Sequence, residues 1–166
     1  ESVSFKAAIP LGVEPLPARE LGDRKARNYA ILENWASFGK VTGMCFFGPA
    51  PRSFIAVDEI VQLVRAVTGW DVDLDELLRI GERATNLARA FNVLHGFSRK
   101  DDVLPRRLFE PLPCGPMEGV AISKPDFERT MGALYELKGW DPATARPTRD
   151  RLRGLEIEWV ADLLEA

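Results

Sequence analysis

The sequence predicts an all-α protein, an irregular multi-helix domain with long ordered loops. Several segments repeat apolar residues at helical spacing, and each is bounded by glycine, proline or a capping residue. No run shows the two-residue alternation that is typical of a sheet strand. The 166 residues are 46% hydrophobic and 28% charged, which suits one domain with its own core or a large lobe of a bigger protein.

The N-terminal segment is expected to be extended. Pro10, Pro15 and Pro17 follow one another closely, and prolines at this density prevent a helix. We therefore divide the chain into an extended linker, residues 1–17, and a helical domain, residues 18–166.

The first helix is expected to begin after about Ala18, where the residues become compatible with a helix. Apolar residues then keep near-helical spacing as far as Gly39. Residues 40–49 differ from the rest because they contain a thiol and several glycines and end at Gly48-Pro49. We predict an ordered loop there.

Two central helices are predicted, over residues 57–68 and 74–94. Gly69 suits the left-handed cap of the first, while Asp73 and Glu76 form an aspartate version of the capping box for the second. Small residues on the second helix predict that another backbone packs closely against it. The predicted inward faces are Ile60, Leu63, Val64 and Val67, then Leu77, Gly81, Ala84, Leu87, Ala88 and Phe91.

The C-terminal part is predicted to contain three shorter helices, over residues 125–138, 149–155 and 157–164, the last with Val160, Leu163 and Leu164 facing inward. Residues 96–125 are too irregular for a long element, so they should either carry short helical turns or be fixed to a partner surface.

Two tryptophans are expected to fill the core after a helix ends. Gly139-Trp140-Asp141 repeats the pattern of Gly69-Trp70-Asp71, with a glycine cap before each indole.

Composition excludes some classes of function. The chain has 22 basic and 25 acidic residues, well mixed, for a net charge of -3. A nucleic-acid or membrane-surface binder needs a clustered basic field, so neither partner is expected. No run approaches the roughly 18 apolar residues of a membrane span, and the first residues do not resemble a secretory signal. We expect a cytoplasmic protein.

The metal-binding residue types are few: Cys45, Cys114 and His95. They are too few for a self-contained metal site. On its own, Cys45 is most often a small buried apolar residue, and Cys114 is expected to be a free, partly exposed thiol. His95 is better explained as a favourable charge at a helix end than as a proton relay.

Polar residues gather on the second central helix and in the loop after it. Glu82, Asn86 and Arg89 share one face, and the loop contains the charged run 99–102. We expect a hydrogen-bond and ion-pair network that holds irregular backbone, in preference to a catalytic cluster. The segment 146–153 is expected to be a solvated basic surface.

One long string is specific to a family. It consists of residues 81–92 and 96–102, continues through Leu104-Pro105, Arg107 and Glu110-Pro111-Leu112, and ends with Tyr135-Glu136-Leu137-Lys138-Gly139-Trp140-Asp141. In this order, from Ala26 to Asp141, the chain closely resembles the C-terminal domain of tungsten-containing aldehyde:ferredoxin oxidoreductases. The resemblance implies that domain's all-α fold.

The resemblance also implies an activity and cofactors. The intact enzyme would oxidise an aldehyde to a carboxylic acid and pass electrons to ferredoxin. It would hold a tungsten (or molybdenum) bis-pterin and a 4Fe-4S cluster, and this domain would form one wall of the cofactor and substrate cavity.

The family's Asp-x-x-Gly-Leu-Cys motif is matched by residues 40–45, Lys-Val-Thr-Gly-Met-Cys. The match implies that Cys45 is the fourth cluster ligand and that Gly43, Met44 and Lys40 lie against a pterin. A backbone without a side chain can approach a flat ligand closely, and clusters require fixed thiolates. Lys40 departs from the family's aspartate, because an ammonium group can only donate hydrogen bonds.

The family's other three cluster cysteines, its N-terminal β domain and its proton-transfer residues do not occur in this sequence. The chain alone is therefore not expected to be active, and its partners would be the N-terminal and middle domains of the same enzyme. The alternative is a stand-alone helical structural or interaction domain that has lost the redox role.

Overall fold

The computed structural model describes residues 8–45 and 55–165, and over these residues the protein is helical. Within the described ranges there is no strand, only an isolated bridge between Trp140 and Pro147. The predicted all-α class is confirmed. The elements are η1 (Ile9–Leu11), α2 (Asp23–Val41), α3 (Val57–Thr68), α4 (Leu74–Leu94), η2 (Arg99–Asp101), η3 (Arg106–Phe109), α5 (Lys124–Lys138), α6 (Arg149–Gly154) and α7 (Trp159–Glu165).

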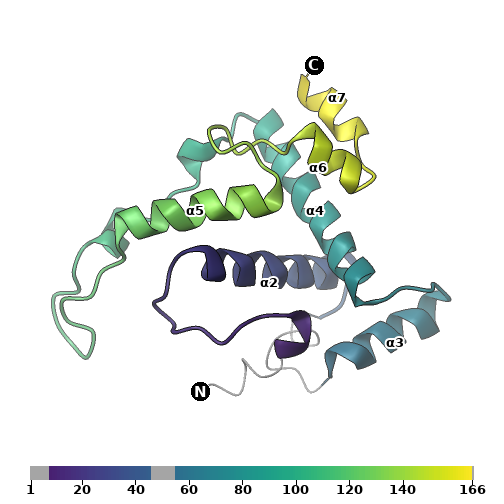
Figure 1. The fold of residues 1–166 in the computed structure, drawn as a ribbon, viewed down its shortest axis with the longest axis horizontal. Coiled ribbons are helices and arrows are strands. Elements are labelled where there is room, and N and C mark those ends of the chain that lie inside the picture. The colour runs from purple at the N-terminus through teal and green to yellow at the C-terminus, as the bar shows by residue number, and fades with distance from the viewer. Residues whose placement is uncertain (1–7, 46–54, 166) are drawn as a thin grey trace.

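Helices α2, α4 and α5 form the centre of the molecule. Helices α2 and α5 lie side by side, and α4 runs across one end of this pair and contacts α2 most extensively (Figure 1). Helix α3 projects beside the beginning of α4, while α6 and α7 lie at the other end of α4. The described part of the chain is therefore built outward from the α2–α4 crossing.

The α2–α4 crossing depends on a glycine. A Cβ atom added to Gly81 would lie 1.8 Å from the backbone oxygen of Asn34 and 3.0 Å from the backbone nitrogen of Phe38. No side chain fits between these two backbones. The predicted close approach of another backbone to the small residues of α4 is confirmed at this position.

The core has two parts. One lies among α2, α3 and α4 around Trp35, Phe38 and Leu77, and the other joins α4 to α6 and α7 around Leu152 and Val160. The part of the core around Trp35 explains why residues 1–17 are not simply an extended linker. In the described part of this segment, Ile9–Leu11 form a 3₁₀ turn, and Ala8, Leu11 and Val13 are buried in that core. Apolar burial thus fixes a segment for which proline content indicated only extension.

The capping signals in the sequence are largely confirmed. Gly69 and Gly139 both adopt the left-handed conformation after a helix. The Asp73 carboxylate accepts a hydrogen bond from the Glu76 backbone N–H at 2.9 Å. The return half of the predicted capping box is replaced, because the Glu76 carboxylate pairs with Arg83 instead.

The long irregular segment between α4 and α5 contains the short turns η2 and η3, so the first of its two predicted forms is confirmed. Helix α2 differs at both ends from the prediction. It begins at Asp23, and it continues through Lys40 and Val41, which were expected in a loop. Residues 46–49 of that predicted loop lie outside the described part of the chain.

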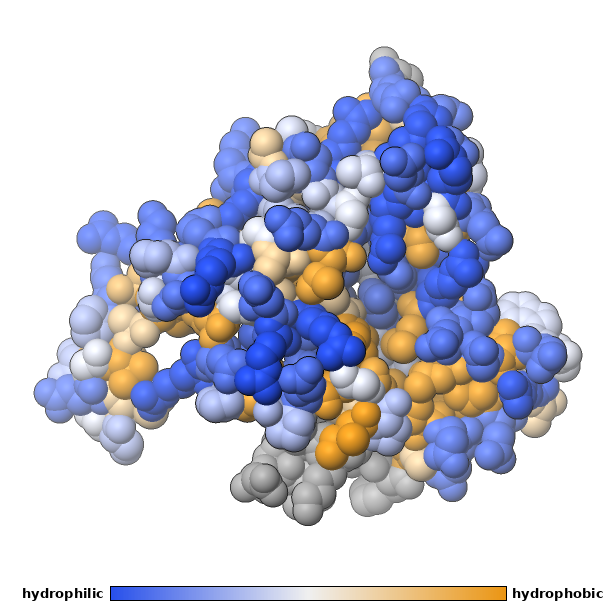
Figure 2. Space-filling view, in the orientation of Figure 1, coloured by the Kyte–Doolittle hydropathy of each residue, from blue (hydrophilic) through white to orange (hydrophobic). Residues whose placement is uncertain are grey.

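The predicted apolar faces are only half covered. On α3, Ile60 and Val64 are buried while Leu63 and Val67 are exposed, and Figure 2 shows hydrophobic residues gathered at the surface over α3 and the adjoining start of α4. Other expected inward residues are exposed as well. They are Leu87, Ala88 and Phe91 on α4 and Leu163 on α7, where Ala161 is buried instead.

Trp70 does not fill the core: it is 60% exposed, so this prediction is wrong. The chain leaves α3 at Gly69 and no described element packs over the indole. Trp140 is partly buried, because its indole N–H donates to Asn86 at 2.9 Å and its ring contacts that of Tyr135. The same local pattern thus has two outcomes, set by what lies opposite each ring.

Gly81→Ala should lower the free energy of unfolding by about 1–3 kcal/mol. The added methyl group would overlap backbone atoms of α2, which cannot rotate away as a flexible side chain can. Gly132→Ala is the matched control within α5, where an added Cβ would meet nothing within 4 Å. The control should gain about 0.5–1 kcal/mol from helix propensity. Urea denaturation measures both, and a neutral Gly81→Ala would contradict the close crossing.

Candidate functional site

The segment Lys40–Cys45 is the C-terminal end of α2 and closes as a Schellman motif. Gly43 has φ 71°, its N–H donates to the Lys40 carbonyl at 3.2 Å, and the Met44 N–H donates to the Gly39 carbonyl at 3.0 Å. The Thr42 hydroxyl adds a hydrogen bond to the Phe38 carbonyl at 2.9 Å. The backbone before Cys45 is therefore held by bonds within the segment itself.

The side chains of this motif separate into an anchor and exposed groups. Met44 is partly buried against the core that contains Phe38, the contact that commonly accompanies a Schellman motif. Lys40 and Cys45 are exposed, and the thiol is free. The expectation that Cys45 is buried is wrong, because the turn at Gly43 directs the chain away from the core.

The motif has the groups for one part of a cofactor site. A Cβ added at Gly43 would meet no described residue within 4 Å, so on the described side the backbone is open to a neighbouring group. Cys45 could give one thiolate, and Lys40 could donate to an anionic or carbonyl oxygen. Within residues 8–45 and 55–165, no group of three or more histidine, cysteine and acidic residues is placed to hold a metal ion.

The other candidate residues lie elsewhere. Cys114 belongs to the segment between η3 and α5, which lies at the opposite end of α2 from Val41 (Figure 1). Cys114 is free and exposed, as predicted. His95 caps the end of α4, where its ring packs at a tilt against that of Phe91, with centroids 4.4 Å apart.

The predicted polar network exists, and Arg89 is its centre. This guanidinium, 8% exposed, donates from Nε to the Ala145 carbonyl at 2.7 Å and from Nη1 to the Asp102 carboxylate at 2.9 Å. Nη2 lies 2.9 Å from the second Asp102 oxygen, so both carboxylate oxygens are in ion-pair contact with the guanidinium. Arg89 thus connects α4 to the loop that follows it and to the loop between α5 and α6.

Asp102 extends the network to α5. Its carboxylate accepts the Tyr135 hydroxyl, while Arg99 lies over the Tyr135 ring at 5.2 Å and pairs with Glu128. Burial, followed by the hydrogen bond to Asp102, raises the pKa of Tyr135 well above its ordinary value. The arrangement stabilises a neutral phenol, and its charged groups form two ion pairs, Arg89 with Asp102 and Arg99 with Glu128.

Glu82 and Asn86 complete the expected face of α4. Glu82 pairs with Arg151 of α6, and the Asn86 side chain donates to the Glu82 carbonyl at 3.0 Å while accepting from Trp140. The prediction of an architectural network is confirmed.

One buried ion pair was missed in the sequence. Lys138 of α5 is 3% exposed and pairs with Glu33 of α2, beside a cavity of about 250 Å³ that Tyr29 and Arg89 also line. The two partners are far apart in sequence, so no helical spacing indicates their contact. Burial, followed by the charge of Glu33, raises the pKa of Tyr29.

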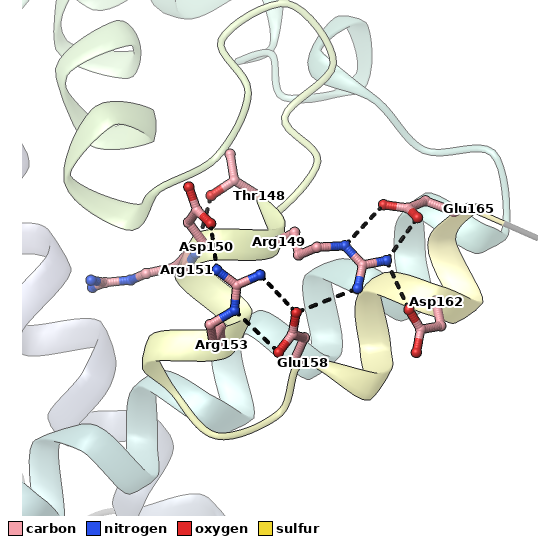
Figure 3. Close-up of polar contacts among 8 residues, drawn as sticks. All are labelled: Thr148, Arg149, Asp150, Arg151, Arg153, Glu158, Asp162 and Glu165. Atoms are coloured by element: carbon pink, nitrogen blue, oxygen red, sulfur yellow. Dashed lines mark hydrogen bonds and ion pairs between the residues drawn. The ribbon is translucent and has the colours of Figure 1, made fainter.

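The predicted basic surface over residues 146–153 proves to be an ion-pair ladder between α6 and α7 (Figure 3). Arg149 pairs with Asp162 and Glu165 at 2.7 Å, and Arg153 pairs with Glu158 at 2.9 Å. The acidic partners come from α7 and the turn before it, so the arginines are accessible to solvent as expected, but their charge is offset by these pairs. These exposed pairs fix the orientation of α7 more than they stabilise the fold.

The described part of the chain is thus an all-α domain with a free, exposed thiol directly after a helix end. A family profile described as "Aldehyde ferredoxin oxidoreductase, domains 2 & 3" matches residues 2–157. The chain belongs to the aldehyde ferredoxin oxidoreductase family.

Individual relatives agree with this assignment. The tungsten-containing aldehyde ferredoxin oxidoreductase of Pyrococcus horikoshii is 30% identical over 142 residues, 84% of this chain and 22% of the relative. The corresponding protein of Thermococcus kodakarensis is 30% identical over 124 residues, 73% of this chain and 19% of the relative. The chain thus spans about a fifth of the length of these relatives.

The fold also matches a solved structure. The BamBC active-site complex of benzoyl coenzyme A reductase aligns with a TM-score of 0.62 and 18% identity, covering 90% of this chain and 22% of that chain. At this identity the likeness concerns the fold alone. No helix in the described part of the chain is both long and apolar enough to cross a membrane.

Gly43→Ala should lower the free energy of unfolding by about 1 kcal/mol, because an alanine in the left-handed conformation is strained even where its methyl group has space. Gly43→Asn is the matched variant and should lose less, since asparagine tolerates this conformation. Thermal denaturation compares the two. Equal stability of Gly43→Ala and the parent would contradict the Schellman geometry.

The two tyrosines should ionise at a higher pH than an ordinary tyrosine. Spectrophotometric titration of the folded protein should find both phenols protonated beyond about pH 10, since each pKa is raised. The unfolded chain loses these protons first, so the free energy of unfolding should fall as the pH rises above about 10. Tyr135→Phe should reduce this fall more than Tyr29→Phe. A titration midpoint near 10 for Tyr135 would refute its buried contact with Asp102.

Proposed function

We propose that this chain is the C-terminal domain of a tungsten (or molybdenum) pterin aldehyde:ferredoxin oxidoreductase, where it forms one wall of the cofactor and substrate cavity. The observation that carries the proposal is the exposed Cys45 thiol, which directly follows the Schellman motif in a chain of this family. Iron–sulfur clusters need thiolates held in a defined position, and the motif supports such a role.

The reaction of the intact enzyme would convert an aldehyde and water into a carboxylic acid, two protons and two electrons. When bound, the metal–pterin supplies the oxidation and the 4Fe-4S cluster conducts the electrons towards ferredoxin. This chain would contribute residues that hold the cofactors and a wall that excludes water. Cys45 would ligate one iron, the open backbone at Gly43 would lie against the pterin, and the helical wall would limit access of water.

Lys40 determines how the domain contacts the pterin. Its ammonium group can meet only acceptors, such as a ring carbonyl or a phosphate oxygen, so the contact differs in polarity from one made by an aspartate. The side chain is exposed on the last turn of α2, where a cation is also favoured by the helix dipole. Lys40 is the observation that favours the second candidate function, a structural or interaction domain without a redox role.

The test is anaerobic metal analysis of the native complex, isolated through a tag on this chain. Tungsten or molybdenum should co-purify with iron, and Cys45→Ser should lose most of the iron because one cluster ligand is gone. Cys114→Ser is the matched control, since this thiol is also free and exposed but lies in the segment at the other end of α2. The control should keep the metal content of the parent.

A folded complex without iron, tungsten and molybdenum would exclude the oxidoreductase and leave the structural domain. Equal iron in the Cys45→Ser variant and the parent would remove the ligand role of Cys45.

A further inference from the structure

Helix α4 has an uncovered apolar face along its C-terminal half. Leu87, Phe91 and Leu94 follow one another at spacings of four and three residues, which places them on one side of the helix, and all three are exposed. Phe97 continues the surface beyond the end of the helix. We call this surface, Leu87, Phe91, Leu94 and Phe97, the outer face of α4.

The outer face carries no charge. Between Ala84 and Leu94 the one charged residue is Arg89, and it is buried on the opposite side in the polar network. Solvent-facing helices normally expose charged side chains, as α5 does with Glu128, Arg129 and Glu136. A helix that is apolar on one side and committed to buried contacts on the other is typical of the interior of a larger protein.

The face continues an existing contact surface. Leu77 and Gly81 lie on the same predicted apolar stripe of α4, and there α2 covers them so closely that no side chain fits at Gly81. Further along, residues of α2 line a common cavity with Ala88 and Asn92 of α4, whereas Leu87, Phe91 and Leu94 are exposed. The apolar stripe therefore extends onto a side of α4 that is exposed in the described part of the chain.

We infer that the outer face of α4 is the permanent docking surface for a further domain of the same enzyme, one that presents an apolar surface of its own. This inference rests on the proposed function. This chain covers 22% of the Pyrococcus horikoshii relative, so most of that relative lies outside the matched region. The remaining length supplies the residues for the domain that would dock on the outer face. Surfaces without charge fit permanent contacts, whereas transient redox partners meet through smaller and more polar surfaces.

Photo-cross-linking of the intact enzyme tests the inference. The photoreactive phenylalanine analogue p-benzoylphenylalanine replaces Phe91 or, in a second variant, Leu94, and the enzyme is isolated through its tag, irradiated and digested. Both positions should cross-link to one peptide of the same enzyme outside these 166 residues, and unfolding in urea before irradiation should abolish that product. Leu137, an exposed apolar residue of α5, is the matched control position and should not give the same peptide.

Other products would overturn the inference. A cross-link to residues 1–166 of a second copy would make the outer face a dimer interface, and a cross-link to ferredoxin or an unrelated protein would make it a transient surface. The absence of any product at both positions would show a surface open to solvent. Metal analysis of the same preparation separates the two proposals, because an enzyme without tungsten, molybdenum and iron can still give the expected cross-link.

Discussion

The buried ion pair of Arg89 with Asp102 holds together the parts of this domain that helix packing alone would leave apart. Its guanidinium is buried on α4, and it fixes two irregular segments, the one after α4 through Asp102 and the one before α6 through the Ala145 carbonyl. Ala145 is fully buried with φ 58°, a conformation that is unfavourable for alanine. The charge-assisted hydrogen bond helps to offset that strain. Removing one member of such a buried pair leaves an uncompensated charge, so loss of either Arg89 or Asp102 should destabilise the fold.

Local signals in the sequence predicted the fold well. The bounds of α3 and α4 follow from apolar spacing and from caps such as Gly69 and Asp73, and these depend on neighbours within four residues. The predictions of burial and of ion pairs were less accurate, because these depend on residues that are distant in the sequence. Spacing indicated that Val67 and Phe91 belong to apolar stripes, but which part of a stripe is covered depends on the length of the helix opposite. The Lys138–Glu33 pair and the acidic partners of Arg149 are long-range contacts with no local periodicity.

The candidate site could be located from the sequence, but its local geometry could not. The motif over residues 40–45 was recognised through its resemblance, with Gly43 interpreted as a place where a ligand approaches. The structure gives Gly43 a second reason, because the Schellman motif requires a left-handed residue there. Lys40 and Val41 were assigned to a loop because the following glycine suggested irregular backbone, whereas the helix continues to the residue before its cap.

Among the described residues, the hydrogen bonds that shape the end of α2 lie between Phe38 and Met44. The turn is therefore formed by the chain itself, and a group that attached to Cys45 would meet a backbone whose conformational freedom has already been lost during folding. Binding would then cost little further chain entropy at this point of contact. If the proposed function holds, the end of α2 would be preformed and the incoming cofactor would have to adapt to it.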